Sequence, residues 1–204
     1  YSIAWNTTSA SNGGHTLTAV ARDAAGNTRS SASVSVTVSN DTTAPVISAV
    51  TASAITPAGA TITWTSDEAS DSQVEYGLTT AYGSVTPLNG SMVTAHSVPL
   101  TGLTDATLYH YRVRSRDAAG NLATSGDFTV TTKDGTAPTV SVTAPAAGST
   151  VSRTVTVTVS ASDNVGVVGV QVKLDGTNLG TEDTASPYSI AWNTTSASNG
   201  GHTL

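Results

Sequence analysis

The chain has 204 residues, a net charge of −6 and no cysteine, so its folded parts hold together without disulfides. Charged residues make up 11% of it and apolar residues 38%, which excludes a highly charged disordered chain and favours β-structure. With 8 basic residues against 14 acidic ones, the chain lacks the basic surface that nucleic acids require. No apolar run approaches the roughly 18 residues of a membrane helix, so we expect neither a nucleic-acid partner nor a membrane span in these residues.

The chain begins and ends on the same seventeen residues. Residues 1–17 read YSIAWNTTSASNGGHTL and recur unchanged at 188–204, so the chain is one 187-residue repeat followed by an overlap. A shorter motif, Arg-Asp-Ala-Ala-Gly-Asn, occurs at 22–27 and again at 116–121. Each copy of this motif closes a predicted domain, which indicates two domains in each repeat.

Two short linkers, with prolines at 45 and 138, divide the chain into three parts. We expect residues 1–40 to be the C-terminal part of one β-sandwich, 41–133 a complete sandwich, and 134–204 the N-terminal part of the next. The predicted fold class is all-β, with tandem sandwiches of about 100 residues each. The prolines hold the linkers extended, so the array should be a semi-rigid rod with about 35 to 40 Å per domain.

The split sandwich lacks strands within either part. The missing strands must come from a covalently attached repeat or from another copy of the chain by strand exchange. Both alternatives remain open, and both make copies of the chain, arranged end to end, the expected partners.

Residues 41–133 carry the strand pattern of a complete sandwich. Ile62 and Trp64 alternate toward one face of the first strong strand. Further strands are expected at 73–76, 97–103 and 109–113. Through these segments, residues 41–133 resemble a fibronectin type III domain over their whole length, and the resemblance implies that Tyr109 forms the tyrosine corner of that family. No Arg-Gly-Asp triplet is present, so integrin binding by that route is not expected.

Residues 134–204, together with the text of residues 1–40, resemble the Ig-like domains of secreted bacterial proteins. The resemblance rests on the alternating runs at 155–159 and 168–174, on Ser-Asp-Asn-Val-Gly at 162–166, and on the passage GGHTLTAVARDAAGN. In the second run, alternation predicts one core-facing set of side chains. This set is Val168, Val170, Val172 and Leu174.

Aspartate and asparagine side chains gather near the domain junctions. The candidates are Asp23, Asn27, Asp41, Asp117, Asn121, Asp134 and Asp163. Calcium prefers carboxylate and carbonyl oxygens, and the resemblance to Ig-like repeats of large bacterial adhesins implies calcium at such junctions. The alternative interpretation is a hairpin turn, because Gly and Asn tolerate positive φ and Asp bonds nearby backbone amides. Calcium is the single cofactor hypothesis, and it stays open beside the turn.

A basic stripe lies along the expected strand at 109–113 and beyond it. It consists of His110, Arg112, Arg114 and Arg116, on the face opposite Tyr109 and Tyr111. One interpretation pairs these cations across strands with Glu75 and nearby aspartates. The other makes the stripe a lateral contact for an acidic patch on a neighbouring molecule.

The tryptophans and the glycosylation sequons complete the candidate residues. Trp5, Trp64 and Trp192 are expected to fill cores and not to stack on sugars. Asn-x-Ser/Thr sequons begin at Asn6, Asn40, Asn89 and Asn193, and they matter where the source glycosylates secreted proteins.

No nucleophile motif, phosphate loop or metal-ligand spacing accompanies the histidines, so we expect no enzymatic activity. The leading hypothesis is a structural repeat unit of an extracellular filament, surface stalk or adhesin whose binding tip lies elsewhere. The alternative is a set of non-catalytic spacer or accessory modules of a secreted carbohydrate-active enzyme. Both hypotheses place the chain outside the cell or at the cell surface.

Overall fold

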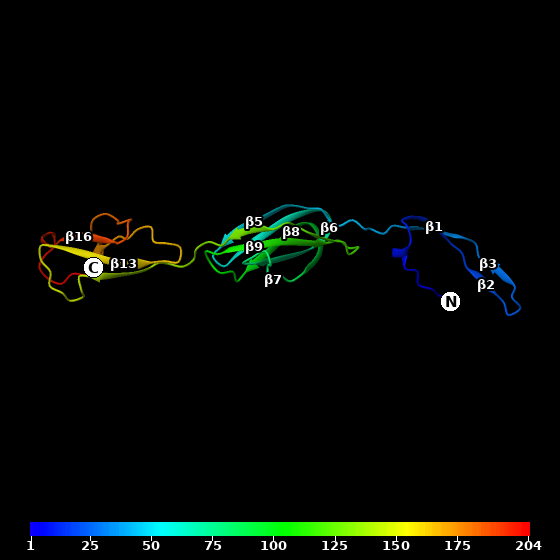
Figure 1. Ribbon diagram of the computed structural model, residues 1–204, viewed down its shortest axis with the longest axis horizontal. Helices are drawn as coiled ribbons and strands as arrows, with labels where there is room; N and C mark the ends of the chain where they lie inside the picture. Colours follow the sequence, from blue (N-terminus) through cyan, green and yellow to red (C-terminus); the bar gives the residue numbers. More distant parts are fainter. The chain divides into compact units, whose positions relative to one another are not determined.

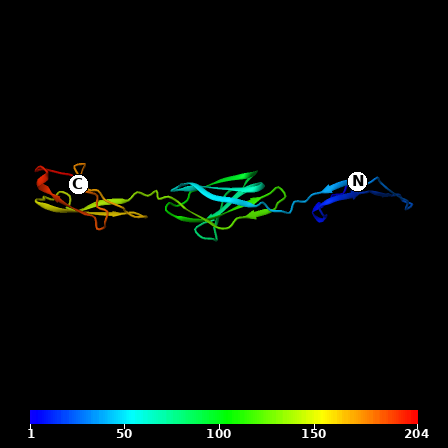
Figure 2. The ribbon, with the colours of Figure 1, turned by 90° about the horizontal axis from the view of Figure 1, so that it is seen from above.

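The computed structural model describes residues 1–204 as an almost purely β-structured chain (Figures 1 and 2). Its two helices are single 3-10 turns, η1 (Thr7–Ser9) and η2 (Thr194–Ser196). The all-β fold class is therefore confirmed. No helix has the length and apolar character needed to cross a membrane.

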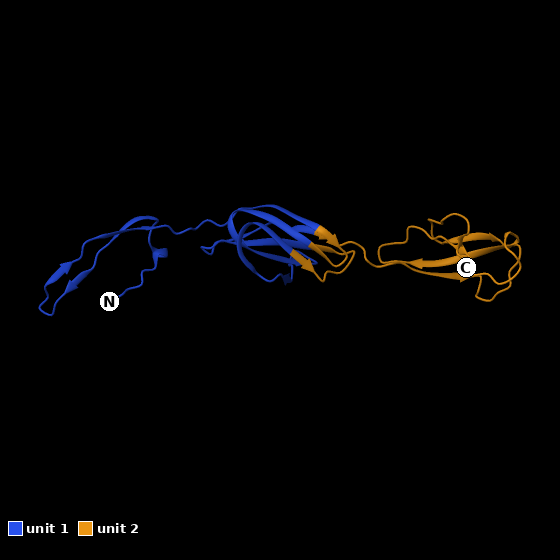
Figure 3. Ribbon diagram, turned by 180° about the vertical axis from the view of Figure 1, so that it is seen from behind, with its two compact units in different colours: residues 1–53, 61–98, 110–129 blue, residues 54–60, 99–109, 130–204 orange.

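The chain divides into two compact units (Figure 3). The first contains residues 1–53, 61–98 and 110–129, and the second contains residues 54–60, 99–109 and 130–204. The boundary between them falls within strands, so the elements are described below by sheet.

A long hairpin forms the N-terminal part of the first unit. Strand β1 (Gly13–Leu17) pairs antiparallel with β4 (Val34–Val38), and β2 (Val20–Arg22) pairs with β3 (Thr28–Ser30). The motif at 22–27 makes the turn, where Gly26 has a φ of +94°, a conformation that favours glycine. The apolar side chains of this hairpin are largely exposed because no second sheet covers them.

The central sheet has seven strands in the order β10-β9-β6-β5, with β7 and β8 also paired to β6 and β11 paired to β9. Its strands are β5 (Ile47–Thr56), β6 (Gly59–Gly77), β7 (Ser84–Val85), β8 (Asn89–Thr101), β9 (Leu108–Arg116), β10 (Leu122–Thr124) and β11 (Phe128–Thr131). The sequence predicts separate strands around 62–64 and 73–76, whereas β6 runs through both. Its middle is held by Asp71, whose Oδ1 accepts a 2.7 Å hydrogen bond from the Arg116 backbone.

The core of the central sheet follows the predicted alternation. Ile62 and Trp64 are buried on β6, and Tyr109, Tyr111 and Val113 are buried on β9. The Tyr109 hydroxyl accepts a 3.0 Å hydrogen bond from the backbone N–H of Thr104, the tyrosine-corner arrangement that the resemblance implies. The Trp64 indole donates to Ser115 Oγ at 2.9 Å, so its polar atom is satisfied inside the core.

The C-terminal part of the second unit contains a three-stranded sheet in the order β12-β13-β16 and a small hairpin. The strands are β12 (Thr139–Ala144), β13 (Thr154–Ser162) and β16 (Ser189–Asn193), with the hairpin β14 (Lys173–Leu174) and β15 (Thr177–Asn178). Its buried cluster consists of Val157, Val159, Val170, Val172, Tyr188 and Trp192.

One predicted core position in this part is wrong. Val168 was expected to face inward with Val170 and Val172, but 89% of it is exposed. Strand pairing reaches back only to Val170, which bridges to Asp183, so the backbone before it does not continue the alternation.

The repeated seventeen residues show how far burial depends on distant partners. Trp192 is 5% exposed because β16 pairs with β13, where Val155 lies opposite it. Trp5 occupies the same place in the repeat and is 41% exposed, so its predicted core position is wrong for this copy. No strand equivalent to β13 pairs with residues 1–5, and the identical sequence therefore leaves its apolar face uncovered.

Candidate functional site

Three carboxylates meet at one end of the central sheet. Asp41 comes from the linker, Glu68 from β6 and Asp117 from the turn after β9, and one oxygen of each lies within 4.8 Å of the others. Burial raises the pKa of Glu68, and the negative charges of Asp41 and Asp117 raise it further. Three oxygens of this kind are the ligands that a hard cation such as calcium prefers.

This cluster brings together two of the predicted calcium candidates and adds one residue that sequence reasoning missed. Glu68 lies in the middle of a strand with no motif around it. Only the long-range pairing of β6 shows that its carboxylate lies near those of Asp41 and Asp117. Asn121, a third candidate, donates from Nδ2 to the backbone oxygen of Asp41 at 3.3 Å and so ties the linker to the turn. Calcium binding here stays a prediction.

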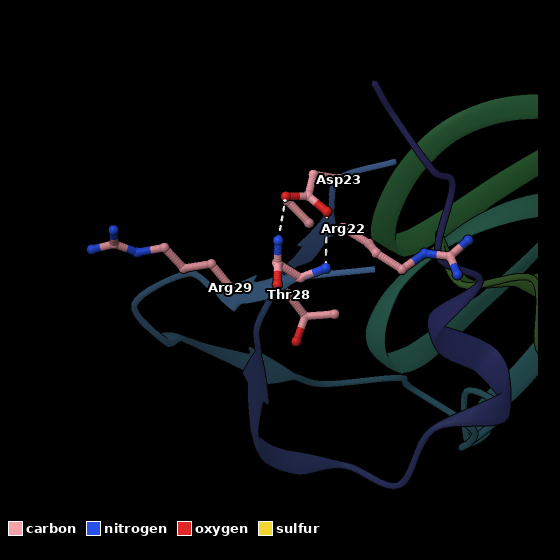
Figure 4. Close-up of a pocket in the computed structure, with 6 residues that line it drawn as sticks. Arg22, Asp23, Thr28 and Arg29 are labelled. Atoms are coloured by element: carbon pink, nitrogen blue, oxygen red, sulfur yellow. Dashed lines mark hydrogen bonds between the residues drawn. The ribbon is translucent and has the colours of Figure 1, made fainter. Parts of the chain in front are cut away.

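The motif at 22–27 builds a turn whose aspartate is already engaged (Figure 4). Asp23 accepts hydrogen bonds from the backbone N–H of Ala25 at 3.0 Å and of Asn27 at 2.8 Å, and from Asn27 Nδ2 at 2.9 Å. These bonds, the one from the Asn27 side chain first, lower the pKa of Asp23. An open hollow of about 370 Å³ lies beside the turn, bordered by Arg22 and Arg29.

The second copy of the motif repeats this geometry in a buried setting. Asp117 accepts hydrogen bonds from the backbone N–H and from Nδ2 of Asn121, both at 2.8 Å. Burial raises the pKa of Asp117, but the hydrogen bonds from Asn121 and the following backbone outweigh it, and the pKa lies below its ordinary value. In both copies the aspartate organises the turn.

The remaining calcium candidates lie apart from the carboxylate cluster. Asp134 accepts from the backbone of Thr136 at 2.9 Å. Asp163 Oδ2 accepts from the backbone of Val165 at 2.9 Å and of Gly166 at 3.0 Å, and these bonds lower its pKa. The other oxygen of Asp163, Oδ1, is buried without a hydrogen-bond partner.

The basic stripe on β9 is paired inside the molecule. Glu75 accepts hydrogen bonds from Arg112 Nε and, at 2.9 Å, from Arg114 Nη1. The Arg112 guanidinium also lies 4.6 Å from the centre of the Tyr82 ring, beside a hollow of about 210 Å³. His110 Nδ1 lies 2.8 Å from a carboxylate oxygen of Asp127.

Arg116, the last member of the stripe, donates from Nη1 to the Gly120 carbonyl at 3.3 Å. The stripe therefore has partners on its own sheet and turn. A lateral contact through it stays a prediction.

His96 is buried among polar side chains, and its sequence context does not single it out. Its ring stacks on Trp64 with centroids 4.8 Å apart and an angle of 7° between the planes. Ser66 Oγ and Ser72 Oγ lie 2.8 Å from its two nitrogens. Burial lowers the pKa of His96, against the opposing effect of the Asp71 charge.

The sequon asparagines take part in local hydrogen bonds. Asn6 and Asn193 cap η1 and η2, accepting from backbone N–H groups at 3.0 and 3.1 Å. Asn89 accepts from the backbone two residues ahead at 3.1 Å, and Asn40 Nδ2 donates to the Thr7 carbonyl at 2.8 Å. Glycosylation of these residues stays a prediction.

Three family models match the chain. The bacterial Ig domain matches residues 138–204, the bacterial Ig-like domain (group 3) matches residues 1–71, and the N-terminal domain of purple acid phosphatase matches residues 45–132. One Ig-type match lies at the C-terminal end of the chain, and the other begins at residue 1 and runs past residue 40 into the central sheet, overlapping the phosphatase-type match from residue 45.

Known proteins with similar segments include two polysaccharide hydrolases. Exoglucanase B of Cellulomonas fimi is 38% identical over 84% of this chain and 17% of its own length, and chitinase A1 of Niallia circulans is 30% identical over 74% of this chain and 22% of its own length. The chain thus spans less than a quarter of either relative. Among solved structures, fibronectin(III)-like modules of Clostridium thermocellum CbhA cover 76% of this chain and align over 82% of their own length, with a TM-score of 0.36 and 22% identity.

Three observations point to β-sandwich domains: the matched Ig-type families, the all-β architecture and the tyrosine corner. The chain contains segments that match bacterial Ig-like families and a central fibronectin type III-like β-sandwich with a tyrosine corner.

Proposed function

We propose that the chain is a set of non-catalytic spacer or accessory modules attached to a secreted carbohydrate-active enzyme. One observation carries this proposal: similar segments occur in an exoglucanase and in a chitinase, enzymes named for different polysaccharides. A segment common to both does not determine which polysaccharide is cut. A spacer that holds a catalytic domain away from other modules suits both enzymes, and it places the chain outside the cell.

The linkers have the hydrogen bonds that a spacer needs. Asp105 Oδ2 accepts from the Gly135 backbone at 3.2 Å and from Thr136 Oγ1 at 2.6 Å, so the linker at 134–136 is held by the sandwich that it leaves. At the other linker, Asp67 Oδ1 accepts from the Val46 backbone at 2.7 Å. Each of these bonds holds the linker residues nearest the central sandwich against that sandwich.

The test is to identify the native polypeptide that contains this segment. An antibody raised against the whole chain would capture it from the culture medium, and its mass and its hydrolysis of cellulose and chitin would be measured. A secreted hydrolase much larger than 20.4 kDa supports the accessory role. An inactive polypeptide made only of these repeats would overturn it.

A structural filament, stalk or adhesin is the second candidate, and the 187-residue repeat with its split sandwich favours it. Electron microscopy of the native material separates the two candidates. Fibres with an axial repeat of about 70 to 80 Å, two domains per repeat, would favour the filament. Dispersed particles would favour the spacer.

A further inference from the structure

We propose that His202 and Asp175 form a proton-dependent clasp, which holds residues 198–204 against the hairpin β14–β15 when His202 is protonated and loosens when it is neutral. The proposal is independent of the accessory role, because it concerns only the local fold of residues 134–204. Three observations carry it: the turn that presents Asp175, the partners of the His202 ring, and a second histidine in the same local sequence.

A tight turn presents the carboxylate of Asp175. Leu174 of β14 pairs with Thr177 of β15, so Asp175 and Gly176 are the two residues of the loop between these strands. Both have positive φ, +50° and +81°. Asp-Gly is a favoured pair in two-residue hairpin loops of this kind. The hairpin therefore holds Asp175 at its tip.

Asp175 binds the C-terminal segment through three contacts. Its backbone N–H donates to the Thr203 carbonyl at 2.8 Å, and its Oδ1 accepts from the Thr203 N–H at 2.8 Å. Its Oδ2 lies 2.6 Å from Nδ1 of His202. The carboxylate thus joins the hairpin to two successive residues, and one of its two bonds requires a proton on the histidine.

Both ring nitrogens of His202 face hydrogen-bond acceptors. Nδ1 faces Asp175 Oδ2, and Nε2 lies 2.8 Å from the Ser198 carbonyl oxygen. A neutral imidazole has one N–H, whereas the imidazolium has two. A neutral ring would leave one acceptor opposite a nitrogen lone pair, but a protonated ring donates to both. The geometry of the closed clasp therefore requires a protonated His202.

The groups around the ring favour the same form. Asp175 is the charged group that contacts His202, and β16 contributes the uncharged Trp192 ring, edge-on with centroids 6.3 Å apart. The hydrogen bond to the Ser198 backbone and then the bond to Asp175 raise the pKa of His202 above its ordinary value of 6.5, against the effect of burial. Hydrogen bonds from the Thr203 backbone and then from His202 lower the pKa of Asp175, so its carboxylate is ionised at neutral pH.

The clasp lies beside the core of this part of the chain. Ala197 and Leu204 pack against the buried cluster, so the clasp lies between two places at which the segment covers the core. The His202 ring is the edge-on neighbour of Trp192, which is 5% exposed. A loosened clasp would release residues 198–203 from the hairpin and uncover this tryptophan.

The repeat supplies a second histidine in the same local sequence. His15 occupies the place of His202, its Nε2 lies 2.7 Å from the Ser11 carbonyl, and its ring meets Trp5 edge-on with centroids 5.7 Å apart. No ion pair joins His15 to a carboxylate. One N–H, on Nε2, therefore satisfies this copy in the neutral form. The contact with Asp175 is what makes the second copy depend on a proton.

The sign of the pH dependence follows from the raised pKa of His202. The stabilisation from the clasp is complete below about pH 6.5, where the ring is protonated in the folded and the unfolded chain alike. It is lost as the pH rises through the higher pKa of the folded state. Within this interval the ratio of closed to open clasp should fall by up to about tenfold for each pH unit.

The first test measures amide hydrogen exchange of the 204-residue chain by NMR at about pH 6, 7 and 8, corrected for the intrinsic exchange rate. The protection factor of the Thr203 amide should fall several-fold over this range. Asp175→Asn keeps a residue that tolerates positive φ and an acceptor for Thr203, but it removes the charge. Its Thr203 protection factor should be lower at pH 6 and nearly constant up to pH 8. His15→Gln, the matched control, should leave the wild-type profile unchanged.

The second test follows the titration of the His202 ring by NMR, with His202→Gln to assign the signal. Asp175→Asn should lower the midpoint of this titration, and His15→Gln should not change it. Circular dichroism verifies that each variant keeps the β-structure of the wild type. Equal His202 midpoints in the wild type and Asp175→Asn, or a wild-type Thr203 protection factor that does not fall as the pH rises, would overturn the proposal.

Discussion

Acidification should destabilise the central sandwich through His96. Burial holds the pKa of His96 below its ordinary value of 6.5, so the folded state prefers the neutral ring. In the unfolded chain, His96 takes up a proton below about pH 6.5. In the folded chain, it takes up that proton only when the pH falls to the lowered pKa. The stabilisation from this residue is therefore complete above pH 6.5 and is lost as the pH falls toward the pKa of the folded state.

The size of this destabilisation follows from the binding of one proton to His96. Between the two pKa values the free energy of unfolding should fall by up to about 1.4 kcal/mol for each pH unit. His96→Gln keeps a neutral polar group among Ser66 and Ser72 and removes the titration. The difference between the two proteins isolates the contribution of this histidine from that of every other titrating group.

The assay is urea denaturation followed by the fluorescence of Trp64, which stacks on His96. A background with Trp5→Phe and Trp192→Phe makes Trp64 the sole tryptophan. Unfolding free energies would be compared at pH 7.5, 6.5 and 5.5 with and without His96→Gln. Parallel pH profiles for the two proteins would refute the reasoning.

Three further outcomes are expected. Trp64→Ala should lower the free energy of unfolding of the central sandwich by about 3 to 5 kcal/mol, because it leaves a cavity in the core and removes the hydrogen-bond donor of Ser115. Urea denaturation measures this loss, and a loss below about 1 kcal/mol would contradict the core assignment. Asp117→Ala should lower the melting temperature of the central sandwich in calorimetry, while Asp23→Ala, in the exposed copy of the same turn, should leave that transition unchanged. If calcium binds the carboxylate cluster, added calcium should raise that melting temperature and EDTA should reverse it, but neither should act on Glu68→Gln, and an unchanged wild-type transition would end the calcium hypothesis.

Local sequence patterns predicted the buried faces of strands well where the burial depends only on alternation along one strand. The two-residue alternation around Ile62 and Trp64 and along β9 correctly identified buried faces, because strand geometry alone decides which side chains share a face. The same reasoning failed for Trp5, whose burial requires a strand equivalent to β13 that is distant in the chain.

The candidate site shows the same limit. Asp41 and Asp117 stand in recognisable motifs, whereas Glu68 joins them only because strand pairing brings a mid-strand residue to the junction. His96 likewise became notable through its stack on Trp64, from another strand. Contacts between residues far apart in the sequence depend on the register of β6, and no single segment contains that information.

The account is tested most directly by the activity of the native polypeptide. Immunocapture from the culture medium, followed by mass determination and assays on cellulose and chitin, would show what these sandwiches are attached to. The accessory role predicts a secreted polypeptide far larger than 20.4 kDa that hydrolyses one of these polysaccharides. A polypeptide that consists of these repeats alone, hydrolyses neither and forms fibres would contradict it.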